Sequence, residues 1–162
     1  MLCLFLAACN GDHLPTLRSF ESAFVVTDEL MLHNMKVGEA TAYTVDSQGM
    51  IYVIDKARKH IKKFDHKGNL VVTFGSPGNG PGLFVLPWVI TCDMNDNIYV
   101  LDLSQSRVNI FDSGGGFLRS FIFSSVGFSG IAIAVSDSGE IYIGGEKPQN
   151  DRSSLMIHKF DH

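Results

Sequence analysis

The stretch GSPGNGPGLFVLP, residues 75–87, is rich in glycine and proline and is the first candidate for chemistry in this chain. A glycine-rich loop can hold a phosphate when a helix begins directly after it, because the unpaired N–H groups and the dipole of the first turn attract the anion. Here the next residues are WVITCD, an apolar and β-branched run typical of a strand, and no Lys-Ser or Lys-Thr pair follows. The sequence therefore favours a connector between two strands over a phosphate site.

The basic run DKARKHIKKFDHK, residues 55–67, is the second candidate. Strand alternation would send Lys59 and Ile61 to one side and His60 and Lys62 to the other, so the charge is not focused on one face. The formal net charge of -4 and the pI near 5.8 give no global attraction to nucleic acid. A solvated hairpin is the favoured interpretation, an anionic partner the second and RNA a distant third, so nucleic acid is disfavoured as a partner.

Four aspartates stand at regular places and could bind calcium or a substrate. Asp46 and Asp93 open the turns between expected first and second strands, whereas Asp55 and Asp102 close aliphatic runs. Aspartate at the start of a turn commonly accepts hydrogen bonds from its own backbone, and aspartate at a strand end can brace the following loop. Turn chemistry is therefore favoured over metal coordination at these four positions.

These residues belong to an internal repeat. Three tyrosines, Tyr52, Tyr99 and Tyr142, recur at intervals of 47 and 43 residues. Each lies in a segment with a polar turn, an Ile-Tyr pair and an aliphatic finish: VDSQGMIYVID at 45–55, CDMNDNIYVLD at 92–102 and VSDSGEIYIGG at 135–145. Cys92 occupies the slot that valine fills in the other two segments, which predicts a small buried side chain and not a nucleophile.

The repeat predicts four short strands in each complete unit. Phe64 and Phe111 each follow their tyrosine by 12 residues, whereas Phe160 follows Tyr142 by 18, and we expect the segment EKPQNDRSS at 146–154 to absorb the excess as a loop. A period of this length with four strands is typical of a β-propeller blade. The expected strands span residues 40–46, 50–55, 59–65 and 69–74 in the first unit and 87–93, 97–102, 107–112 and 117–123 in the second.

The stretch GSPGNGPGLFVLPWVITCDMNDNIYVLDLSQSRVNIFDSGGGFLRSF resembles an NHL repeat. All three units share this pattern, and the chain is most similar to bacterial six-bladed β-propeller lipoproteins. The resemblance implies an all-β fold of four-stranded antiparallel blades, at approximately 38–74, 87–123 and 130–162. The third unit departs from the pattern, with Gly145 where the others have aspartate. In this fold residues 75–87 join the outer strand of one blade to the inner strand of the next.

Propellers use the central channel and the loops at one face as sites. We expect a non-catalytic binding or scaffold module that holds a protein, peptide or glycan; the alternative is a metal-dependent lyase or lactonase whose ligands lie in missing blades. No cofactor is predicted and no histidine falls on an expected inner strand, although calcium or another divalent ion in the channel remains open. The residues that we expect at the binding face are Phe84, Trp88, Ser104, Gln105, Arg107, Lys56 and Arg58.

The chain opens with MLCLFLAACNGDH, an apolar run that ends in small residues and is too short to span a bilayer. It resembles a bacterial lipoprotein signal in which Cys9 is lipidated, although no Lys or Arg precedes the apolar run. We therefore expect residues 1–21 to be a signal and linker, and the protein to be anchored by lipid in the bacterial cell envelope, at the outer membrane or facing the periplasm.

Three blades cannot close a ring, because each blade buries its faces only against its neighbours. Residues 22–37 add one or two expected strands to the propeller region 22–162, and the count still falls short. We expect the chain to be a fragment of a longer protein; if it is complete, it must close by self-association.

Overall fold

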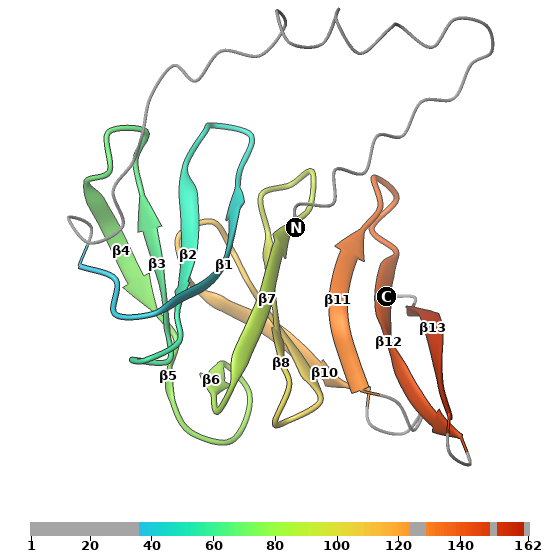
Figure 1. The fold of residues 1–162 in the computed structure, drawn as a ribbon. Coiled ribbons are helices and arrows are strands. Elements are labelled where there is room, and N and C mark those ends of the chain that lie inside the picture. Colours follow the sequence, from blue (N-terminus) through green and yellow to red (C-terminus); the bar gives the residue numbers. More distant parts are fainter. Residues whose placement is uncertain (1–35, 124–128, 150–151, 161–162) are drawn as a thin grey trace, which may run out of the picture.

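The computed structural model describes residues 36–123, 129–149 and 152–160 of the protein (Figure 1). All regular structure in these residues is β-strand, which confirms the predicted all-β class. In this part of the chain no helix has the length and apolar character needed to cross a membrane. The predicted signal, the lipidation site at Cys9 and nearly all of the predicted strand segment 22–37 lie outside the described residues.

Two four-stranded antiparallel sheets and one three-stranded antiparallel sheet follow one another along the chain. The first sheet contains β1 (Ala40–Val45), β2 (Ile51–Asp55), β3 (His60–Phe64) and β4 (Leu70–Phe74). The second contains β7 (Pro87–Cys92), β8 (Ile98–Asp102), β9 (Arg107–Phe111) and β10 (Phe117–Ile122). The third contains β11 (Ser129–Val135), β12 (Ile141–Gln149) and β13 (Arg152–Phe160).

The eight strands predicted for the first two units are all present, and their ends fall within one residue of the predicted ones. Local chemistry explains this accuracy, because the turns between first and second strands and between third and fourth strands each contain a glycine or an aspartate at a positive φ. Gly49 has a φ of 77° and Asp96 a φ of 61° at equivalent places in the two first turns. Glycine and aspartate adopt this conformation at low cost.

The connector between the first two sheets is confirmed as a link from an outer to an inner strand, and no helix follows it. It also contains two short strands that the sequence does not reveal, β5 (Ser76–Pro77) and β6 (Leu83–Phe84), which pair in parallel.

The three sheets stand side by side as an unclosed arc of propeller blades (Figure 1). The first strands β1, β7 and β11 are neighbours and line its inner side. Apolar side chains fill the two seams between sheets: one cluster joins Tyr52 and Ile54 of β2 to Val100 of β8, and another joins Leu101 of β8 to Ile143 of β12. Each sheet therefore buries one face against the next, as a propeller requires.

The third sheet differs from the prediction for residues 146–154. The described residues of this segment, 146–149 and 152–154, do not form a loop; they lengthen both strands of a hairpin, so that β12 and β13 each have nine residues. Pairing continues without interruption from Ile141 opposite Phe160 to Gln149 opposite Arg152. The prediction of a loop was wrong because an insertion of equal length on both sides of a hairpin extends the ladder and keeps its register.

Candidate functional site

One end of the arc carries the loops between second and third strands and the connectors between sheets. We call this end the loop face, formed by residues 36–39, 56–59, 75–86 and 103–106, and it lies at the lower side of Figure 1. The opposite end, the turn face, is formed by the tight turns 46–50, 65–69, 93–97, 112–116 and 136–140. The predicted binding residues belong to the loop face or to strand ends beside it.

Asp102 holds the loop face of the second sheet together. Its carboxylate is fully buried, and Oδ2 accepts hydrogen bonds from the backbone N–H groups of Val85 and Leu86 at 2.7 and 3.0 Å. Oδ1 accepts a further bond from the N–H of Gln105 at 3.0 Å. The carboxylate thereby ties the end of the connector to the loop between β8 and β9, which confirms the predicted bracing role.

Asp55 has the same position in the first sheet and is also fully buried. Its Oδ2 atom accepts a bond from the N–H of Gly38 at 3.2 Å and lies 2.9 Å from Nζ of Lys62 and 3.1 Å from a guanidinium nitrogen of Arg58. Burial by itself would raise the pKa of this carboxyl, but the bonds from Lys62, Gly38 and Arg58 outweigh it and lower the pKa to about 2. Lys62 also donates to the carbonyl of Lys36.

Trp88 is the partly exposed aromatic residue of the loop face, with 38% of its surface accessible. It sits in β7 where the pairing with β8 shifts between Pro87 and Val89. The ammonium of Lys56, from the first sheet, lies 5.5 Å from the centre of the Trp88 ring. Glu39 pairs with the same ammonium at 2.8 Å. The cation thus links two neighbouring sheets over an accessible indole.

The remaining predicted binding residues have different surroundings. Ser104 is exposed. Gln105 is engaged with the connector, because its side chain accepts from the N–H of Gly80 and donates to the carbonyl of Leu83. Arg107 donates to the hydroxyl of Ser120 on the neighbouring strand. The structure therefore brings Lys56 and Trp88 into contact, while Gln105 and Arg107 hold parts of their own sheet.

Phe84 was predicted at the binding face, and this prediction is wrong. Its side chain is fully buried in the seam between the first two sheets, 5.9 Å from the Phe111 ring between centroids. A Cβ atom placed on Gly75 would lie 2.2 Å from the Phe84 ring. The connector therefore wraps Phe84 into the core, and the ring cannot meet a ligand from solvent.

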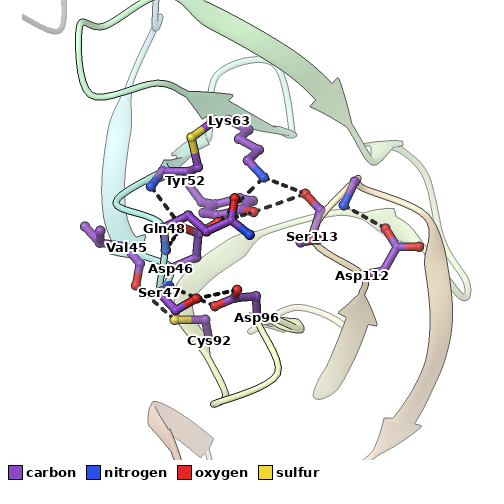
Figure 2. A network of polar contacts seen from close by, with 12 residues as sticks. Val45, Asp46, Ser47, Gln48, Tyr52, Lys63, Cys92, Asp96, Asp112 and Ser113 are labelled. Atoms are coloured by element: carbon purple, nitrogen blue, oxygen red, sulfur yellow. Dashed lines mark hydrogen bonds and ion pairs between the residues drawn. The ribbon is translucent and has the colours of Figure 1, made fainter.

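The turn face holds a polar network that bridges the first two sheets (Figure 2). The hydroxyl of Tyr52 donates to Oδ2 of Asp46 at 3.0 Å and lies 3.1 Å from the carbonyl oxygen of Ser113 in the second sheet. The ammonium of Lys63 donates to the same carbonyl at 2.9 Å and lies 3.6 Å from Asp46. Burial, followed by the bond to Asp46, raises the pKa of Tyr52.

A second contact of this network joins the two first turns directly. The N–H and hydroxyl of Ser47 both bond the carboxylate of Asp96, each at 2.8 Å. The thiol of Cys92 lies nearby and donates to the carbonyl of Val45 at 3.1 Å. Cys92 is half-buried, and so less buried than predicted, and it packs against the apolar seam. We did not predict the network from the sequence, although the 47-residue spacing places Asp46 and Asp93 at equivalent turns.

Asp46 and Asp93 confirm the predicted turn chemistry. Oδ1 of Asp46 accepts from the N–H groups of Gln48 and Met50, and Oδ1 of Asp93 accepts from those of Asn95 and Asn97. Within the described ranges, no three His, Cys, Asp or Glu side chains gather closely enough to form a candidate metal site.

Comparison with known proteins agrees with this geometry. A family model described as a 6-bladed beta-propeller matches residues 41–126, just over half of the chain. Protein lin-41 of Caenorhabditis elegans is 42% identical over 48 residues, which make up 30% of this chain and 4% of lin-41. The predicted resemblance to NHL-type six-bladed propellers is thus confirmed.

Two solved structures share the fold. A protein of Bacteroides fragilis, named as exported, superposes with a TM-score of 0.57 at 20% identity, covering 66% of this chain and 30% of that protein. Virginiamycin B lyase from Staphylococcus aureus superposes with a TM-score of 0.53 at 11% identity, covering 76% of this chain and 41% of the lyase. At these identities the likeness concerns the fold alone, and the chain spans less than half the length of each of these relatives.

Proposed function

Because this chain belongs to the six-bladed β-propeller family, we propose that it serves as a non-catalytic binding or scaffold module that holds a protein, peptide or glycan at its loop face. The observation that carries the proposal is the accessible indole of Trp88 with the Lys56 ammonium 5.5 Å from its centre. An aromatic ring beside a fixed charge combines apolar contact area with directional polar contact, and both are typical of residues that dominate binding energy.

The loops around this aromatic residue are held in place before any partner arrives. Asp102 fixes the connector that leads into β7, and Asp55 fixes the segment that leads into β1. A surface that is already ordered loses little conformational entropy on binding, which favours affinity. Exposed Ser104 and the partly exposed guanidinium of Arg58 would add polar contacts around the indole.

A photo-crosslinking experiment tests this proposal. A photoreactive residue placed at position 104 of the full chain should capture a defined partner from an envelope extract, and the Trp88→Ala variant should lower the affinity for that partner by at least about tenfold. Leu118→Ala, which truncates an exposed apolar residue on the outer strand β10, is the matched control and should leave affinity unchanged.

Two results would contradict the proposal. Equal affinities for Trp88→Ala and Leu118→Ala would show that the loop face is not the binding surface. Turnover of a substrate that a chelator abolishes would show that the protein is an enzyme and not a passive module.

We further propose that the protein is a lipoprotein of the bacterial cell envelope, lipidated at Cys9. The support is the apolar run that ends in Leu6, Ala7 and Ala8 before this cysteine, together with the shared fold of an exported Bacteroides fragilis protein. Native protein should partition into the membrane fraction, and Cys9→Ser should release it. Equal membrane association of both forms would exclude a lipid at this residue.

A further inference from the structure

A pocket of about 340 Å³ opens on the turn face at the seam between the second and third sheets. It is bounded by the turn 93–97 between β7 and β8, by residues 136–139 between β11 and β12, and by Arg119 of β10. We propose that this pocket binds one neutral, hydroxyl-rich saccharide unit. The site is separate from the loop face, so the inference goes beyond the function proposed above.

The first seam shows why a pocket exists at the second seam. Between the first and second sheets, the turns are clamped where Ser47 bonds both carboxylate oxygens of Asp96 (Figure 2). The repeat places Met94 at the position of Ser47 and Gly139 at the position of Asp96 in the second seam. Neither side chain can make the clamp, because a thioether donates no hydrogen bond and glycine has no side chain.

In the described part of the chain, the interior of the second seam also lacks a polar bridge that the first seam has. Lys63, which crosses the first seam to the carbonyl of Ser113, corresponds to Ile110 in the second sheet. The buried apolar side chain of Ile110 belongs to the core of the second seam and makes no polar bridge there. Among the described residues, the turns of the second seam therefore have neither the Ser47–Asp96 clamp nor a lysine in the place of Lys63, and the guanidinium of Arg119 lies there instead. The counterpart of Ser113 is position 162, outside the described residues.

The lining of this pocket mixes both signs of charge with neutral polar groups. The carboxylate of Asp93 and the guanidinium of Arg119 both bond the hydroxyl of Tyr99, which fixes one positive and one negative group at the pocket wall. The opposite turn contributes the exposed carboxylate of Asp137 and the hydroxyl of Ser138. Each oxygen of Asp93 already accepts two hydrogen bonds, so the exposed carboxylate of Asp137 is the acceptor that the wall offers to a ligand, and the guanidinium of Arg119 is the donor.

This combination selects the chemical class of ligand. A purely anionic ligand would meet net repulsion, because Asp93 and Asp137 outnumber the one guanidinium of Arg119; a cationic ligand would pair with the carboxylates but would still lie beside Arg119. An apolar ligand would strip water from these groups without replacing their hydrogen bonds, which is costly. A neutral molecule whose adjacent hydroxyls both donate and accept meets neither penalty, and the volume lies within the range of small-molecule sites.

The test uses the full chain, isotopically labelled for NMR, and three neutral probes: glucose, galactose and N-acetylglucosamine. At least one probe should shift the backbone amide signals of residues 94–97 and 137–139 at millimolar concentration and leave the loop face unchanged. Glucuronate, the anionic counterpart, should bind more weakly. Asp137→Ala should weaken binding by at least about tenfold, since a hydrogen bond to a charged group is lost.

A double variant that introduces the clamp of the first seam into the second seam gives the decisive test. Met94→Ser combined with Gly139→Asp installs the residues of the first seam, and the backbone permits it because Gly139 and Asp96 have φ values of 84° and 61°. This variant should fold, with a small loss of stability because aspartate at a φ of 84° is strained, and it should lose the probe-dependent shifts. Ser104→Ala, on the loop face, is the control and should bind as the natural chain does.

Three results would overturn the inference. These are the absence of shifts at the pocket amides with all three neutral sugars, tighter binding of glucuronate than of the neutral sugars, or full binding by the folded clamp variant. Loss of partner binding at Trp88 would leave this inference untouched, because the two sites lie on opposite faces.

Discussion

Replacing Asp102 with alanine should destabilise the protein strongly, because one buried carboxylate organises the loop face of the second sheet. The side chain is inaccessible to solvent and accepts bonds from the N–H groups of Val85, Leu86 and Gln105, at 2.7, 3.0 and 3.0 Å. The side-chain amide of Gln105 adds a longer bond at 3.2 Å. Alanine offers none of these donors an acceptor.

The expected loss follows from the number of donors left without a partner. A buried donor that loses its acceptor costs about 1–3 kcal/mol, so three backbone N–H groups would cost about 3–9 kcal/mol if water could not reach them. The three bonds are only partly buried, and water can replace some of them after the carboxylate is removed. We therefore expect Asp102→Ala to lower the free energy of unfolding by about 3–5 kcal/mol.

Urea unfolding followed by tryptophan fluorescence measures this change directly. Trp88 is the single tryptophan of the chain and follows the segment that Asp102 holds, so its emission reports on the affected region. Asp65→Ala is the matched control, because Asp65 accepts three comparable bonds from Lys67 and Asn69 in an exposed turn where water can replace them. Equal losses for the two variants would refute the argument that burial sets the cost.

Three further predictions concern the first sheet and its connector. Because the pKa of Asp55 is lowered to about 2 from 3.8, the stability that its ionised form contributes is complete above pH 4 to 5 and is lost as the pH falls toward 2. The Asp55→Asn variant should therefore make the free energy of unfolding depend less on pH in this window. An unchanged dependence on pH would contradict this prediction. Gly75→Ala should destabilise more than Gly49→Ala in thermal unfolding, since both have φ values above 70° but only the Cβ at Gly75 meets the Phe84 ring. Phe84→Ala should cost about 3–5 kcal/mol by urea unfolding, and a loss below 1 kcal/mol would show that the ring is not a core residue.

The strands were predictable because their signals are local. Alternating apolar residues, the Asp-initiated turns at Asp46 and Asp93 and the recurring Ile-Tyr pairs lie within a few residues of the structure they specify. The bracing roles of Asp55 and Asp102 were predictable for a related reason, since the repeat places both at the same strand end. Such signals need no knowledge of how one sheet packs on another.

Predictions from local sequence failed at Phe84 and in the segment 146–154. In the sequence Phe84 follows a glycine-rich connector and looks like an exposed loop residue, yet Gly75, nine residues earlier, leaves the space that its ring fills. In the same way, the length of an insertion does not reveal whether its two halves will pair. Both outcomes depend on contacts that form only after the chain has folded back on itself.

The sequence by itself determined the repeat, the fold class, the order of strands and the connector between sheets. The tertiary structure decided which side chains meet across a seam: Lys56 with Trp88 at one face, and Ser47 with Asp96 at the other. The physical reason is that strand signals have a period of two residues and act through neighbours, whereas seam contacts join residues 32 and 49 positions apart. The packing of whole sheets sets which turns face one another, and the residues at the facing positions then decide between a clamp and a pocket, as at Met94.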